Sequence, residues 1–230
     1  MSDSQAVIEH APALRHHFAD MEQQRNAASL AMWVCLGTEI MFFGGMFCAY
    51  LIYRLAYYNE FAVASRTLSL PIGTINTAVL ICSSLTVALS VRSAQLGKQK
   101  SVIVLLVLTL LFGLAFLGIK AYEWHEKFVE HHIPGSSFSF DEAMPGHAEA
   151  KIDPRHAQIF FSLYFAMTGM HALHMIIGVG IFSVLIYLAW RGRFTPQYHT
   201  PVEIGGLYWH FVDIVWIYLF PLLYLIDRHK

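Results

Sequence analysis

The sequence predicts an all-α polytopic membrane protein built as a bundle of five transmembrane helices. Of its 230 residues, 56% are hydrophobic and only 13% are charged, whereas soluble domains carry about 25% charged residues. Mean hydropathy is +0.49. A spanning helix needs roughly 20 mostly apolar residues. Five segments meet this requirement, at about 29–54, 72–95, 101–122, 157–190 and 204–227.

Polar segments flank the five spans and define the organisation of the chain. We expect a cytoplasmic tail over residues 1–28, one membrane domain over residues 29–230, and an outward acidic loop over residues 123–156. The tail lacks the charged, apolar and small regions of a signal peptide in their usual order, so the first span is expected to remain as an anchor.

Positive charge predicts the orientation, because cytoplasmic loops are enriched in Lys and Arg. Residues 92–100, around the connection between the second and third spans, hold three cations and no acid, while residues 123–153 hold seven acids. These charges predict a cytoplasmic N-terminus and a periplasmic C-terminus. The three cations are Arg92, Lys98 and Lys100.

The net charge and the cysteines argue against nucleic-acid binding and against a disulfide or zinc framework. A net charge of −1 gives no basic surface for nucleic acid. Cys35, Cys48 and Cys82 lie in apolar segments without CxxC spacing, so they are expected to be small buried hydrophobes rather than disulfides or zinc ligands. Four histidines of the acidic loop lack a repeated ligand spacing and are expected to be solvated. They are His131, His132, His147 and His156.

The first span carries one acid, Glu39, in the run WVCLGTEIMFFGGMF. Its neighbours three and four residues away are a cysteine, a leucine and two phenylalanines, so the carboxyl projects from an apolar stripe. Two hypotheses fit this pattern. Glu39 is either a hydrogen-bonded group that fixes helix packing, or a group coupled to proton movement, the usual hypothesis for an intramembrane acid.

The second span carries small polar side chains and no charge in the run INTAVLICSSLTVALS. Such side chains let helices approach closely and hydrogen-bond across the contact. We therefore expect a helix-packing role for four of them. They are Asn76, Thr77, Ser83 and Ser84.

The third span ends in GIKAYEWHEKF. Lys120 and Glu123 are three residues apart on one helix face and are expected to pair near the membrane interface. Trp124 is typical of the aromatic belt found at that depth. We expect these three residues to anchor the end of the helix.

The fourth span contains TGMHALHMIIG, in which Thr168, His171 and His174 follow one another at three-residue steps. They share a helix face that continues to Gly178. Such a stripe could ligate a metal or haem, or it could hold neutral histidines that hydrogen-bond to a neighbouring helix. The second interpretation is favoured, because no other span supplies a matching histidine pair.

The fifth span contains GLYWHFVDIVWIYLF, in which two polar residues interrupt an apolar run. Glu203, His210 and Asp213 fall at steps of seven and three on one helix face. Because unpaired polar groups are costly in hydrocarbon, this stripe must face protein, lipid headgroups or a wet cavity. His210 and Asp213 are expected to hydrogen-bond to each other. Trp209 is expected to flank a buried polar seam between the fourth and fifth spans.

The last span also carries a family resemblance. YWHFVDIVW at 208–216 resembles the signature YWHFVDVVW of subunit III of the haem–copper oxidases, the cytochrome c oxidase family. Glu203, seven residues before His210, and the nearby His199 match the same pattern. TGMHALHMIIG at 168–178 resembles the family's TGxHxxHxxxG.

Three further segments resemble the same family. INT at 75–77, preceded by Pro71, resembles the family's PxLNT. The run that begins at Glu39 resembles its membrane glutamate, and Lys120 to Trp124 resembles its Glu-aromatic pair. The matches follow family order over about residues 30–227. Many members have seven spans, whereas the five spans expected here are similar to the bacterial form.

The resemblance implies a non-catalytic accessory subunit without a redox centre of its own. Haem and copper are then expected in partner subunits, and this chain packs on catalytic subunit I beside subunit II, which holds copper or binds the donor. It stabilises the active site and supports proton uptake through Glu39 in a proton-translocating cytochrome c oxidase of aerobic respiration. The bacterial form places it in the inner membrane.

Further partners and alternatives remain open at the level of the sequence. Cytochrome c, a larger respiratory supercomplex and a phospholipid at the Glu203–His210 seam are candidate partners. The chain could instead be subunit III of a quinol oxidase, or the related subunit of a nitric oxide reductase. A haem-binding electron carrier that uses His171, His174 and His210 is a different class. So is a proton-coupled transporter built around Glu39 and Asp213.

Overall fold

The structure, a computed structural model, describes residues 18–135, 138–140, 153–196 and 198–226. This part of the chain contains six helices and no strand. Five of the helices are long and apolar enough to cross a membrane, so the predicted all-helical class with five spans is confirmed. These five are α1 (Met21–Ala56), α3 (Leu70–Gln95), α4 (Gln99–Val129), α5 (Pro154–Trp190) and α6 (Thr200–Tyr224).

The first helix begins inside the segment that was expected to be a tail. The Asp20 carboxylate accepts a hydrogen bond from the Gln23 amide at 2.6 Å and caps the first turn. This cap starts α1 at Met21, well before the apolar span. Residues 1–17 of the expected tail lie outside the described part.

The acidic loop is shorter than expected, because helices enter it from both sides. α4 continues to Val129, and α5 starts at Pro154 behind an Asp153 cap that accepts from the Arg155 amide at 2.9 Å. Proline suits the first turn of a helix, since its missing N–H would be unpaired there anyway. Residues 141–152, with three of the acids and His147, lie outside the described part.

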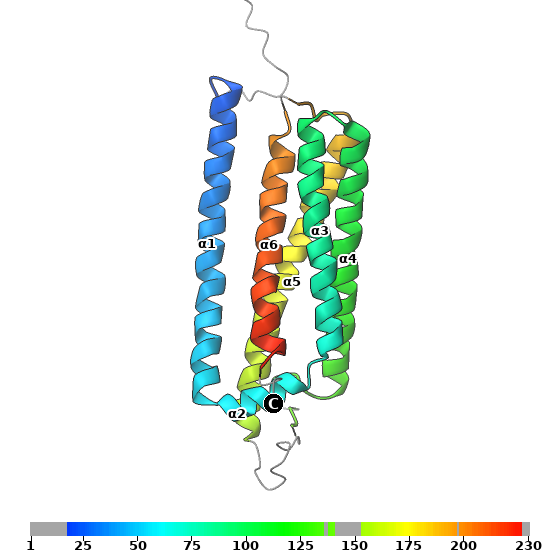
Figure 1. Cartoon of the computed structure of the whole chain (residues 1–230). Helices are drawn as coiled ribbons and strands as arrows, with labels where there is room; N and C mark the ends of the chain where they lie inside the picture. The colour runs from blue at the N-terminus through cyan, green and yellow to red at the C-terminus, as the bar shows by residue number, and fades with distance from the viewer. Residues whose placement is uncertain (1–17, 136–137, 141–152, 197, 227–230) are drawn as a thin grey trace, which may run out of the picture.

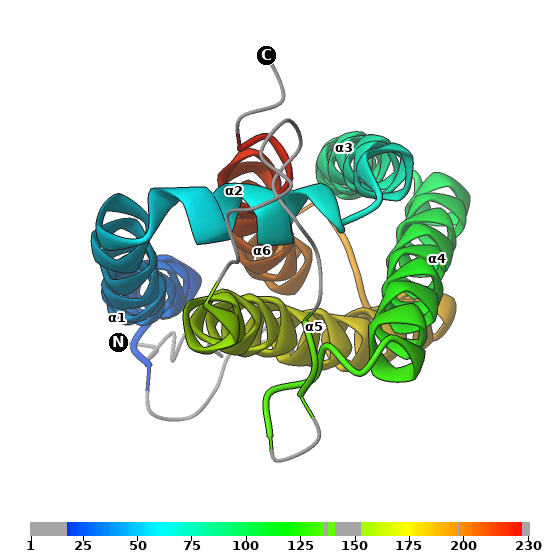
Figure 2. The same cartoon turned by 90° about the horizontal axis from the view of Figure 1, so that it is seen from below.

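A short helix that the sequence did not predict, α2 (Tyr58–Arg66), crosses one end of the bundle. It runs from α1 toward α3 and passes below the end of α6 (Figures 1 and 2). The five residues 61–65 are all buried. The Ser65 hydroxyl donates to the Leu223 carbonyl at 2.6 Å, which ties α2 to α6. Nine residues of mixed composition give too short a pattern to distinguish from a loop.

Four of the long helices form a closed ring, and α1 stands outside it. α3 packs on α4, α4 on α5, α5 on α6, and α6 on α3. Among the long helices α1 contacts only α5 and α6, and Figure 2 shows it at the side of the ring. The core is therefore a four-helix bundle with one attached helix.

The side chain of Trp209 fills the centre of the four-helix ring. It projects from α6 and is fully buried. A Cβ atom added at Gly113 of α4 would lie 2.6 Å from this ring, and one added at Gly178 of α5 would lie 2.9 Å from it. The indole Nε1 donates to the Ser83 hydroxyl of α3 at 3.0 Å. One residue of α6 thus contacts the other three helices.

The three cysteines differ from the expectation that they are buried. Cys35, Cys48 and Cys82 are free and exposed on the outer surface of the chain. In a membrane helix the outer surface is itself apolar, because lipid tails are as apolar as a protein core. A weakly polar thiol therefore fits either side of the helix, and apolar neighbours in the sequence do not predict burial.

The close fit around Trp209 generates a stability prediction. Gly113→Ala should lower the free energy of unfolding by about 1–3 kcal/mol, because the added methyl overpacks a rigid ring. Gly118→Ala is a matched control on the same helix, since no atom lies within 4 Å of the Cβ position there. Thermal unfolding in detergent measures both variants. Equal midpoints for the two would contradict the proposed fit.

Candidate functional site

A buried ion pair lies between Lys120 and Glu123 of α4. Lys120 Nζ is 3.0 Å from Glu123 Oε2, and the two side chains are 2% and 0% exposed. The ammonium also donates to the hydroxyls of Tyr164 on α5 and Tyr224 on α6, at 3.0 and 2.7 Å. Both hydroxyls donate in turn to Glu123 Oε1. All three ammonium donors and both carboxylate oxygens therefore have partners.

The predicted pairing is present, and the pair is buried inside the bundle. The pair points inward between α4, α5 and α6, because two tyrosines that are distant in sequence supply its remaining hydrogen bonds. The Trp216 ring adds a cation–π contact, with its centroid 5.1 Å from the ammonium. Trp124, the third expected anchor, is half-buried and packs edge-on against Phe165 at 5.9 Å between centroids.

His171 lies in the core next to this ion pair. Its ring packs edge-on against Phe116 of α4 at 5.4 Å and tilts against Trp216 of α6 at 5.1 Å between centroids. Neither ring nitrogen has a hydrogen-bond partner within the described residues. Charged groups without partners are costly in such a place, so a neutral imidazole fits this site.

A second pair connects the attached helix to the ring. Glu39 of α1 and His174 of α5 lie 3.1 Å apart, measured from carboxyl Oε2 to ring Nε2. The other ring nitrogen of His174 lies 2.8 Å from the Met170 carbonyl. The Tyr208 hydroxyl donates to the His174 carbonyl at 3.1 Å. Sequence analysis singled out both members of this pair but did not predict that they meet.

The geometry fixes how many protons this pair shares. A carbonyl only accepts hydrogen bonds, so His174 Nδ1 must carry a proton to bond with Met170. The contact between Nε2 and Glu39 then needs one further proton, which sits either on the imidazole or on the carboxyl group. The pair is neutral overall in both cases. Moving this proton between the imidazole and the carboxyl group leaves the net charge of the pair unchanged, because the proton stays within the pair.

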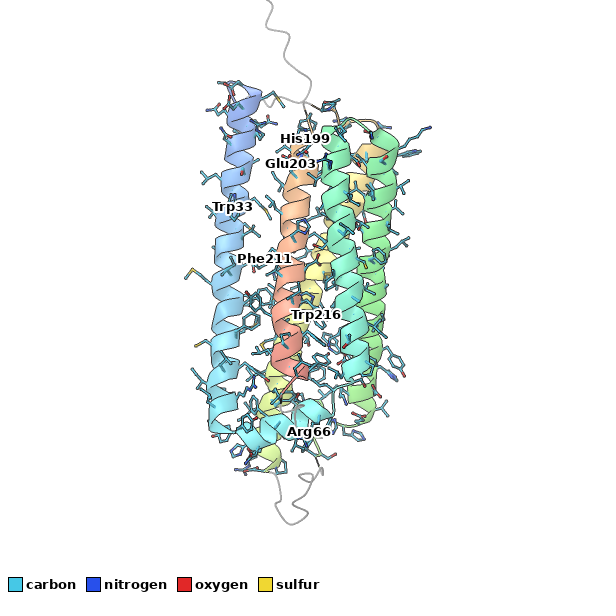
Figure 3. All side chains as sticks on the ribbon, viewed as in Figure 1. Trp33, Arg66, His199, Glu203, Phe211 and Trp216 are labelled. Carbon is cyan, nitrogen blue, oxygen red and sulfur yellow. The ribbon has the colours of Figure 1, made fainter. Side chains whose placement is uncertain are left out.

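Two polar residues of the predicted α6 stripe, Glu203 and His210, contact α3 rather than α5. The Glu203 carboxylate accepts from Gln95 Nε2 at 2.9 Å and lies 3.1 Å from His199. Both residues lie near the upper end of α6 in Figure 3, and Trp216 lies lower. His210 Nδ1 is 2.7 Å from the Ser84 hydroxyl of α3. The predicted polar stripe is thus present along α6, but the expected seam with the preceding span is wrong.

The expected hydrogen bond between His210 and Asp213 does not form. Asp213 is 3% exposed, and neither of its oxygens has a hydrogen-bond partner within the described residues. The Ser84 hydroxyl is instead bonded to His210 Nδ1. The imidazole turns toward α3, because the serine offers it a partner at a better position than the acid on its own helix.

The small polar residues of α3 lie at helix contacts, where a packing role was expected for them. Ser83 accepts from Trp209, and Thr77 accepts from Trp216 Nε1 at 3.1 Å. Asn76 is fully buried, and its amide has no partner within the described residues. Thr168 of α5 bonds to its own helix, to the Tyr164 carbonyl at 2.7 Å.

The three histidines of the spans do not converge on one site. His171 faces the core, His174 faces α1, and His210 faces α3. The part of the chain that the structure describes contains no group of three or more metal-ligating side chains. Sequence analysis also missed Tyr164 and Tyr224 as partners of the ion pair. Tyr164 lies one helical turn before Thr168, so extending the polar stripe backward would have found it.

Comparisons with known proteins find relatives along most of the chain. The model of the family described as cytochrome c oxidase subunit III matches residues 154–227. Cytochrome c oxidase subunit 3 of Gallus gallus is 32% identical over 84% of this chain and 67% of its own length. The same subunit of Corynebacterium diphtheriae is 32% identical over 88% of this chain and 89% of its own length. Quinol oxidase subunit 3 of Bacillus subtilis is 30% identical over 90% of this chain and 92% of its own length.

The buried ion pair generates a second prediction. Lys120→Met and Glu123→Leu should each cost about 3–5 kcal/mol of stability, because each strands a buried charge. The double variant should cost clearly less than the sum of the two, since it leaves no charge behind. A double-mutant cycle on thermal unfolding measures the coupling. Strictly additive losses would show that the two groups do not depend on each other.

His132 lies outside the spans and has an unusual environment. Its ring stacks on Phe161 at 4.9 Å and is almost fully buried. Nδ1 is 3.2 Å from a Glu130 oxygen, in a geometry that does not make a hydrogen bond. Burial lowers the pKa of His132 below its ordinary value of 6.5, and the Lys127 ammonium lowers it further, against the opposing effect of Glu130.

This shift predicts a pH dependence of stability. The folded protein holds the neutral ring more tightly than the unfolded chain does. The contribution of His132 is therefore complete above about pH 6.5 and is lost as the pH falls through its lower folded pKa, by at most about 1.4 kcal/mol per pH unit. Wild type should lose more thermal stability between pH 7.5 and 5.5 than His132→Gln does. Parallel losses would contradict this assignment.

Proposed function

This chain belongs to the cytochrome c oxidase subunit III family, and we propose that it is the accessory, non-catalytic subunit of a proton-pumping terminal oxidase. In this role it packs on catalytic subunit I, beside subunit II, and stabilises the active site during turnover. Haem and copper belong to those partner subunits. Electron transfer and oxygen reduction then take place outside this chain.

One observation carries the accessory role: two of the three span histidines are already engaged within the chain. His174 bonds to a carbonyl and to Glu39, and His210 contacts Ser84. Aromatic rings enclose His171. A side chain that ties two helices together is a poor candidate for a redox ligand. This supports a structural use of the histidines.

Cytochrome c is the donor we propose for the complex, with quinol as the second candidate. Relatives named cytochrome c oxidase subunit 3 and relatives named quinol oxidase subunit 3 both match the chain. The quinol oxidase subunit of Bacillus subtilis matches over 92% of its length. The seven acids of residues 123–153 would complement a basic cytochrome c. Comparing reduced cytochrome c with a quinol as reductant of the purified complex decides between the two donors.

The chain is a multi-pass membrane protein, and we place it in the bacterial inner membrane with its N-terminus in the cytoplasm. The helix ends that carry Arg25, Arg92 and Arg191 all lie at one end of the bundle, the upper end in Figure 1. Such a cationic end is typical of the cytoplasmic side. The opposite end carries α2 and leads into the acidic segment.

We also propose that a phospholipid chain lies between α1 and α6. An apolar groove of about 430 Å³ separates these helices, and His210 lines it together with Trp33 and Phe43. Glu203 does not line this groove, so the lipid site includes only the His210 end of the expected seam. Lipid in this position would support the attached helix where the protein leaves it uncovered.

The association with an oxidase is tested by purification of the chain from its native membrane in mild detergent. The expected result is co-purification with subunits that carry haem and copper, in a fixed ratio. Recovery of the chain alone would overturn the accessory role. A haem absorption band in the isolated chain would overturn it as well.

Glu39 generates the functional prediction, because it shares its proton with His174 at the margin of the bundle. Glu39→Gln should leave assembly of the complex intact but slow proton uptake or shorten sustained turnover. Glu22→Gln is the matched control, since it removes the same charge from an exposed site on the same helix. Normal pumping, turnover and inactivation in Glu39→Gln would reduce this residue to a packing role.

A further inference from the structure

A second groove lies on the opposite side of the ring, between the outer faces of α3 and α4 where they join. It has a volume of about 540 Å³. Its polar rim combines Arg92, Lys98 and Lys100 with the hydroxyls of Ser93 and Ser101. α1 contacts neither of these two helices, so this groove is separate from the one beside His210.

The turn between α3 and α4 positions these cations. Gly97 adopts a positive φ of 69°, a conformation that glycine takes readily, and the Lys98 amide donates back to the Ser93 carbonyl at 2.9 Å. Lys98 is the residue that caps the start of α4, and Lys100 lies in its first turn. The first turn of α4 has no acid. The positive end of the helix dipole therefore adds to the cationic side chains.

The positive charge of this rim is not neutralised within the described residues. Arg92, Lys98 and Lys100 are exposed and take part in no ion pair there. Glu203 is the acid of the adjoining helix end, and it is already bonded to Gln95 and His199. Three cations, two hydroxyls and a helix N-terminus together favour an anion with several oxygens, such as a phosphate group.

The remaining lining is apolar and points to a ligand with a hydrocarbon part. Leu89, Leu96 and Val104 line the groove and are 43%, 57% and 64% exposed. Leu89 and Val104 lie further into α3 and α4 than the cations do, which is toward the middle of the membrane. A free phosphate would gain nothing from these side chains, whereas an acyl chain would bury them.

We propose that this groove binds an anionic phospholipid, with its phosphodiester headgroup on Arg92, Lys98 and Lys100 and an acyl chain along Leu89 and Val104. Basic pockets between transmembrane helices at the cytoplasmic side are a recurrent way to bind such headgroups. The positive-inside rule alone also accounts for cations in this turn. It requires no groove, however, and no contact between a bound phosphate and particular side chains.

The test uses the full chain in mild detergent and native mass spectrometry during titration with phosphatidylglycerol. Phosphatidylcholine with the same acyl chains is titrated in parallel. Lys98→Gln/Lys100→Gln should weaken phosphatidylglycerol binding about 25-fold, since each cation near an anionic headgroup contributes about fivefold. Lys98→Arg/Lys100→Arg keeps both charges and should keep binding. All substituted residues are exposed, so the variants should melt as wild type does.

Arg191→Gln/Arg193→Gln is the matched control, because it removes two charges at the same end of the bundle, outside the groove. It should leave binding within about twofold of wild type. Three outcomes would overturn the proposal. They are equal weakening in both charge-removing variants, equal binding of phosphatidylcholine by wild type, and displacement of the lipid by millimolar inorganic phosphate, which would assign the site to a free anion.

Discussion

A helix enclosed by other helices in a membrane has no water to satisfy its polar side chains, and this constraint determines how α6 is held. Two indole N–H groups and one imidazole of α6 reach hydroxyls of α3 at 2.7 to 3.1 Å. The hydroxyls belong to Thr77, Ser83 and Ser84, which lie in a stretch of α3 without a charged side chain. Small residues on α3 are therefore acceptors that fix the rotation of α6, and with it the position of Trp209 between Gly113 and Gly178.

The same constraint explains the Lys120–Glu123 network. A lone lysine at this place would be very costly, but every donor and acceptor of the pair is met from α4, α5 and α6. Such a network specifies one arrangement of three helices, since a small shift of any of them would leave a charge without a partner. The network lies at the end of the ring that α2 covers and holds the helices together there. Trp209 holds them together in the middle of the ring.

The sequence predicted what depends on local composition, and it failed where partners are distant in the chain. Five apolar stretches were enough to place five helices, because burial in lipid needs only length and hydropathy. Helix periodicity likewise put Lys120 beside Glu123. It could not reveal that Glu39 meets His174 or that His210 prefers Ser84, since these contacts join helices whose relative rotation is set by packing. Asp213 was expected to bond to His210 because the two lie on one helix face. A single sequence shows such neighbours on the same helix, but it does not show partners on other helices.

The Lys120–Glu123 pair and the Glu39–His174 pair differ in how far they are exposed. The Lys120–Glu123 network is buried, and each of its donors and acceptors has a partner within the described residues. Glu39 is 28% exposed and His174 is 11% exposed, and they share one proton at the edge of the attached helix. Glu39 on α1 is therefore the residue that we propose for a role in proton uptake, while the four-helix ring provides the support against which α1 is held.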